Sequence, residues 1–132
     1  MKKIIRVLSF FVFPLMVYLL NIIFYRFMDV CLIYPWVDIP MHFFGGFTIG
    51  FSFVLLFNFF EEENLIELKN KILFVFIIVS IVGFIAVLWE FYEFLLAFFG
   101  IVEMQTWTDT LSDLLIGIFG GFCISFWKSF SR

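Results

Sequence analysis

The sequence predicts an all-α protein, a polytopic membrane helical bundle with four transmembrane helices. The 132-residue chain is 64% hydrophobic and only 14% charged, whereas soluble domains carry about 25% charged residues. Its mean hydropathy is +1.15. Four long apolar runs are each close to the ~20 residues that a helix needs to cross a ~30 Å hydrocarbon core.

The first span is expected over about residues 7–25, behind a start that carries Lys2, Lys3 and Arg6. This run is longer than the apolar region of a signal peptide and has no small-residue cleavage site, so we expect it to be retained. Pro14 lies inside it and is expected to kink the helix.

The next residues, 26–40, are too polar and too interrupted by proline to span, and we expect them to lie along the membrane surface. Pro40 suits the first turn of the second span, over about residues 40–60, and Asp38 suits its N-cap.

The third and fourth spans follow a charged segment. Residues 61–71 form a polar turn, and the apolar runs after it predict spans over about 72–95 and 108–127. The length of the chain predicts a single membrane domain, residues 1–132. The two cysteines do not form a CxxC pattern, so we expect neither a disulfide framework nor a cysteine metal site.

The distribution of Lys and Arg predicts the orientation. With four spans both termini lie on one side, and seven of the eight Lys and Arg residues fall on that side, with only Arg26 opposite. Because cytoplasmic loops carry an excess of Lys and Arg, we expect both termini in the cytoplasm.

Two stretches of the chain, 36–50 and 107–121, read almost as copies. Each contains Trp, Asp, an ionisable residue, Gly and Gly, with steps of four residues after the Asp. A four-residue step returns to nearly the same helix face. The copies are 71 residues apart, which suggests two tandem helical hairpins, and internal repeats are common in membrane transport folds. The small-xxx-small steps predict helix packing at Gly46, Gly50, Gly117 and Gly121.

Six ionisable side chains are predicted to meet in one shallow layer near the outer membrane boundary. Tryptophans mark that boundary, and His42 and Asp113 lie about 9 Å inward along their helices. Glu90 lies about 27 Å along the third span and reaches the same depth. A charge in hydrocarbon costs about 2.5–3.5 kcal/mol, so the six must face one another or a water-filled pocket. They are Asp38, His42, Glu90, Glu93, Asp109 and Asp113.

Five carboxylates and one histidine leave this layer short of positive charge. Some acids could stay protonated, a divalent cation could bind, or a cationic group could dock. The helix N-termini that point into the layer also favour anions, so a metal-bridged phosphate of a lipid headgroup fits there. The candidate metal ligands are Asp38, His42, Glu93 and Asp109, and the candidate catalytic residues are Glu90 and Asp113.

Each of these residues also has a structural interpretation. Asp38 and Asp109 suit N-caps, and Asp113 completes a Thr-x-x-Asp capping box. His42, one turn from Asp38, suits a buried hydrogen-bonded pair. Glu90 is the hardest to explain structurally, because an acid near a helix C-terminus opposes the helix dipole.

Three short motifs between Asp38 and Gly121 carry a family resemblance. The chain resembles the VanZ-like membrane proteins and, more closely, a related family of inner-membrane proteins typified by YjdF. This resemblance implies a multi-span protein of the plasma (inner) membrane of a bacterium or archaeon, and implies no particular reaction. VanZ-like proteins often carry a Gln after the middle Glu, an Arg before the last helix and an Asn in it, whereas this chain has Glu93, no such Arg and Gly117. The motif residues are Asp38, His42, Phe43, Gly45 and Gly46; Trp89, Glu90 and Glu93; and Asp109, Thr110, Asp113 and Gly120.

Three functions stay open on this sequence. The first is a small integral membrane protein whose outward-facing Asp/His/Glu pocket binds a cation and binds or acts on a lipid-linked or phosphorylated envelope substrate. The second is a non-catalytic bundle whose polar layer is structural. The third is a proton- or cation-coupled carrier, which at this size would need a homodimer. Membrane lipids are expected partners and nucleic acid is not, and the sequence does not decide whether the protein is an enzyme.

Overall fold

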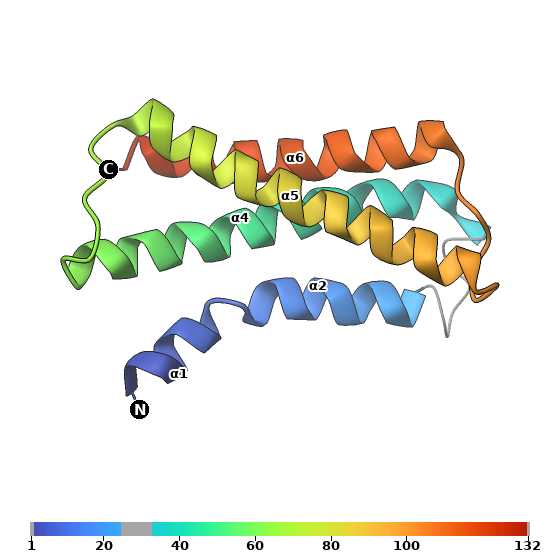
Figure 1. Ribbon diagram of the computed structural model, residues 1–132, viewed down its shortest axis with the longest axis horizontal. Helices are drawn as coiled ribbons and strands as arrows, with labels where there is room; N and C mark the ends of the chain where they lie inside the picture. Colours follow the sequence, from blue (N-terminus) through green and yellow to red (C-terminus); the bar gives the residue numbers. More distant parts are fainter. Residues whose placement is uncertain (1, 25–32, 132) are drawn as a thin grey trace.

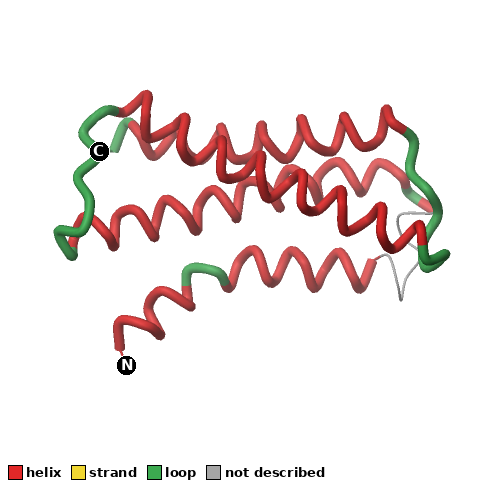
Figure 2. Tube along the Cα trace, in the orientation of Figure 1, coloured by secondary structure: helices red, strands yellow, loops and turns green. Residues whose placement is uncertain are grey.

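The computed structural model describes residues 2–24 and 33–131 and shows a bundle of helices (Figures 1 and 2). Helices α4, α5 and α6 are each long and apolar enough to cross a membrane, and α1 with α2 forms a fourth candidate span that is bent by 45°. This confirms the predicted helical membrane fold. The helices are α1 (Lys2–Ser9), α2 (Val12–Ile22), α4 (Asp38–Glu62), α5 (Lys71–Phe98) and α6 (Trp107–Ser129), with the 3-10 helix η2 (Pro35–Val37) before α4.

The three long helices extend slightly beyond the predicted spans. Helix α4 begins and ends two residues outside 40–60, and α5 and α6 enclose 72–95 and 108–127. The end of the first predicted span and residues 26–32 of the predicted surface segment, with Arg26 and Cys31, lie outside the described residues.

The bend between α1 and α2 lies one turn before Pro14, as expected for a proline kink. Proline has no backbone N–H and its ring crowds the carbonyl four residues earlier, which here belongs to Phe10. That carbonyl accepts a hydrogen bond from the Ser52 hydroxyl of α4, at 2.6 Å. Because Ser52 is fully buried, this contact joins the bend to the side of α4.

Glycines bring α4 and α6 into direct backbone contact. A Cβ atom on Gly46 would overlap the Gly117 carbonyl, and a Cβ on Gly120 would overlap the Phe43 carbonyl. Neither position can hold a side chain unless the helices separate. Gly120 is outside the four-residue repeat, so the repeat pattern missed it.

The same contact continues toward the end of the bundle where Lys2 and Ser129 lie, here called the terminal end. A Cβ on Gly50 would lie 3.2 Å from the Gly121 Cα, and a Cβ on Gly121 would lie 2.7 Å from the Val82 side chain of α5. Gly46 therefore meets Gly117 and Gly50 meets Gly121, so residues that are equivalent in the repeat touch across the α4–α6 contact.

A buried apolar cluster and two ion pairs hold the helices together in the terminal half of the bundle. The buried apolar cluster lies between α4 and α5 and consists of Val54, Phe74, Ile78 and Val82. At the terminal end Arg6 pairs with Glu62 at 2.7 Å, and Lys3 pairs with Glu63. The sequence suggested only a solvated turn at these glutamates, but α4 continues to Glu62 and presents them to α1.

The close contact at Gly46 predicts a contrast with its neighbour Gly45, where a Cβ would meet nothing within 4 Å. We expect Gly46→Ala to lower the free energy of unfolding by about 1–3 kcal/mol, the usual cost of overpacking. Gly45→Ala should be neutral or stabilise by about 0.5–1 kcal/mol, because alanine is the better helix former. Thermal unfolding of both purified variants measures this, and equal destabilisation would contradict the backbone contact.

Candidate functional site

The candidate site lies at the end of the bundle opposite the terminal end, where α4 and α6 begin and α5 ends (Figure 1). We call this the site end. Three helices bring five ionisable residues together there: Asp38 and His42 from α4, Asp113 from α6, and two glutamates from α5.

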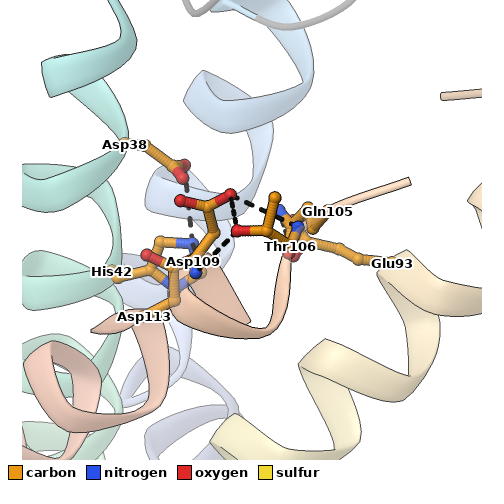
Figure 3. A network of polar contacts seen from close by, with 7 residues as sticks. All are labelled: Asp38, His42, Glu93, Gln105, Thr106, Asp109 and Asp113. Atoms are coloured by element: carbon orange, nitrogen blue, oxygen red, sulfur yellow. Dashed lines mark hydrogen bonds and ion pairs between the residues drawn. The ribbon is translucent and has the colours of Figure 1, made fainter. Parts of the chain in front are cut away.

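His42 is at the centre of this arrangement (Figure 3). Its Nε2 atom lies 3.5 Å from Asp38 Oδ1 and 3.7 Å from Asp113 Oδ2. Asp38 reaches it because it lies one turn earlier on the same helix face. Asp113 reaches it because α6 packs tightly against α4 one turn further along, where a Cβ on Gly46 would overlap the Gly117 carbonyl.

These three side chains are largely withdrawn from solvent. The exposed fractions are 9% for His42, 5% for Asp113 and 20% for Asp38. The facing atoms Asp38 Oδ1, His42 Nε2 and Asp113 Oδ2 are buried and have no hydrogen-bond partner among the described residues. A buried polar atom without a partner costs about 1–3 kcal/mol, so three such atoms facing one another require an explanation.

The distances point to a shared ligand. Separations of 3.5 and 3.7 Å exceed the 2.7–3.2 Å of an ordinary hydrogen bond. Two ligand atoms that bind one tetrahedral metal ion at ~2.1 Å lie about 3.4 Å apart. The three ligand atoms of Asp38, His42 and Asp113 lie within 4.8 Å of one another, so one cation could contact all three after small side-chain shifts.

Helix α5 supplies a second group of possible ligands. Glu90 and Glu93 lie three residues apart on one helix face, and each has a carboxylate oxygen within 4.8 Å of a ring nitrogen of His42. The Gln105 side chain donates a hydrogen bond to Glu93 Oε2 at 3.3 Å (Figure 3). Sequence reasoning missed Gln105, whose one signal is its position as a polar side chain directly before α6.

Asp109 has a different role from the other predicted site residues. It forms a capping box with Thr106: the Thr106 hydroxyl accepts from the Asp109 backbone N–H, and Asp109 Oδ2 accepts from the Thr106 backbone N–H. The Thr106 hydroxyl also lies 2.6 Å from Asp109 Oδ2. The structure therefore places Asp109 outside both groups of possible ligands among the described residues.

Three capping assignments from the sequence are wrong, and one of them is Asp109, which lies at N3 while Thr106 is the N-cap. The capping box uses Thr106 and Asp109 because α6 already begins at Trp107, which places Asp113 in the second turn, where it is buried. Asp38 is not the N-cap of α4, because Val37 holds that position and no side chain caps it. The Asp38 carboxylate faces His42 instead.

Charge at the site end is unbalanced. Four carboxylates from Asp38, Asp113, Glu90 and Glu93 surround a single histidine, and no Lys or Arg forms an ion pair with them in residues 2–24 and 33–131. The N-termini of α4 and α6 favour negative charge here, but the C-terminus of α5 opposes it. An added cation would balance this set.

A match to a protein family places the chain in the membrane class. A family model described as predicted membrane protein (DUF2238) matches residues 3–132, which include every helix that carries a site residue. No curated protein and no solved structure matches the chain significantly. The match agrees with the membrane class that the resemblance implies, whereas the relationship to VanZ-like and YjdF-like proteins stays a prediction.

The capping box predicts coupled effects on stability. Thr106→Ala and Asp109→Ala should each lower the free energy of unfolding by about 1 kcal/mol, the usual cost of losing a cap. Because the two side chains serve the same helix end, the double variant should lose little more than either single variant. Thermal unfolding of the three variants measures this, and fully additive losses would show that Asp109 makes a separate stabilising contact.

Proposed function

Because the chain belongs to this family of predicted membrane proteins, we propose that it binds a divalent cation and, through it, a lipid-linked or phosphorylated substrate of the cell envelope. The cation ligands would be Asp38, His42 and Asp113. With both termini in the cytoplasm, the site end faces the outer side of the plasma membrane, where lipid headgroups lie.

One observation carries this proposal. Asp38 Oδ1, His42 Nε2 and Asp113 Oδ2 are buried, face one another and have no hydrogen-bond partner among the described residues. If the layer only locked the bundle, we would expect these atoms to be hydrogen-bonded, as most buried polar atoms are. Imidazole nitrogen with carboxylate oxygens is a ligand set that suits zinc or manganese.

The neighbouring glutamates suit a role beside the cation. Glu90 and Glu93 are only partly buried, and a position near the membrane surface would give them access to water as well as to the His42 region. A bound cation would attract phosphate oxygens and withdraw charge from the phosphorus. Glu90 would then be placed to accept a proton from water or from a substrate hydroxyl.

Cation binding gives a direct test. We expect about one divalent cation per chain in elemental analysis of purified protein, and a lower melting temperature after chelation, since a ligand that binds the folded state stabilises it. Asp113→Asn and His42→Gln should each weaken binding at least tenfold, because even the loss of a residue that only hydrogen-bonds a metal ligand costs about 10–100-fold. Glu103→Gln is the matched control, because Glu103 is an exposed acid in the loop before α6.

Two results would contradict the proposal. One is protein that contains no divalent cation and has the same melting temperature with chelator, zinc or manganese. The other is equal loss of cation in the Glu103→Gln control, which would indicate nonspecific binding to acidic groups. Either result would favour a polar layer that only supports the bundle.

A further inference from the structure

An apolar cleft of about 440 Å³ lies between α2 and the face formed by α4 and α5. Its volume falls within the ~300–1,000 Å³ of typical ligand sites. His42 belongs both to the wall of the cleft and to the candidate site, whereas Asp38 and Asp113 do not line the cleft. Its lining at the site end includes Tyr18, Asn21, His42 and Trp89, and its deeper lining includes Leu15, Ile49, Phe53 and Val82.

Helix α2 closes the cleft on one side and packs loosely. None of its residues is buried, and it packs mainly against α4. It approaches α5 through Tyr18 and Trp89, whose rings meet edge to face at 5.8 Å. The cleft therefore has one wall that is weakly attached to the rest of the bundle.

The cleft is polar at one end and apolar along the rest. Asn21 and His42 are at the site end, and the walls beyond them are hydrocarbon. From His42 to Phe53 on α4 the wall is about 16 Å long at 1.5 Å per residue. That is about half of a ~30 Å hydrocarbon core, which is the depth of one lipid leaflet.

Gly45 supports a role for this space. Unlike Gly46, it makes no close contact with another helix, because a Cβ there would meet nothing within 4 Å. A glycine inside a helix is less favourable than alanine. Gly45 lines the cleft, and its missing side chain widens the cleft beside His42.

We propose that this cleft holds one hydrocarbon chain of a lipid whose phosphate headgroup lies at the Asp38–His42–Asp113 site. This inference rests on the proposed function and deepens it, because it makes the substrate a lipid phosphate and not a water-soluble phosphate. Three features favour this occupant: the polar end at Asn21 and His42, the apolar walls, and a length of one leaflet.

The test uses Trp89, which lines the cleft. The other three tryptophans, Trp36, Trp107 and Trp127, are 65%, 83% and 64% exposed and can be changed to Phe. The protein in nanodiscs is then titrated with lysophosphatidate that carries a brominated chain, which quenches nearby tryptophan. We expect quenching that saturates at low lipid fraction. Brominated lysophosphatidylcholine should bind at least tenfold more weakly, and His42→Gln should remove this difference.

A variant pair tests the cleft itself. Gly45→Leu should fill the space and weaken lysophosphatidate binding at least tenfold. Ser80→Leu places the same side chain on the exposed face of α5 and should leave binding unchanged. Ala86→Leu is a second way to fill the cleft. Native mass spectrometry counts the lysophosphatidate molecules bound to protein that keeps all four tryptophans, so this result does not depend on the Phe variants.

The outcomes separate this inference from the proposed function. Quenching that rises in proportion to lipid without saturating, or that Gly45→Leu and Ala86→Leu leave unchanged, would overturn the cleft inference. Displacement of the lipid by glycerol 3-phosphate as readily as by unlabelled lysophosphatidate would also overturn it, because the chain would then add nothing. The proposed function is tested by a separate measurement. It fails if elemental analysis of the same preparation finds no divalent cation.

Discussion

At Gly46 and Gly117, α4 and α6 approach until backbone meets backbone. Lipid tails are as apolar as the side chains of this protein, so close packing must do what the hydrophobic effect does in water. A rigid contact one turn away from His42 fixes where Asp113 lies. The site therefore depends on the lack of a side chain at Gly46 and Gly120, because a Cβ at either position would force the helices apart.

The same contact explains why the internal repeat matters. Equivalent positions of the two copies touch: Gly46 meets Gly117, and His42 faces Asp113 across the helix pair. The copies differ at their ionisable position, His in one and Asp in the other. That difference places an imidazole nitrogen opposite a carboxylate oxygen. Helix α5 adds Glu90 and Glu93 from outside the repeat, so three helices contribute side chains to the polar layer.

Much of this arrangement could be predicted, because it follows from periodicity and membrane depth. Four-residue steps put His42 and Gly46 on one face, and span lengths put Glu90 at the same depth. The capping roles could not be predicted, because they depend on whether α6 begins at Trp107 or later, a shift of a few residues. The contact of Ser52 with the Phe10 carbonyl and the cleft behind α2 depend on how separate helices pack, which no local pattern encodes.

We propose that Asp38, His42 and Asp113 share one cation. X-ray absorption at the zinc edge of zinc-loaded protein tests it most directly, because it reports the atoms bound to the metal. We expect one imidazole nitrogen and carboxylate oxygens at about 2.0–2.2 Å, with the imidazole signal lost in His42→Gln. A spectrum with no imidazole, or one that His42→Gln leaves unchanged, would contradict it.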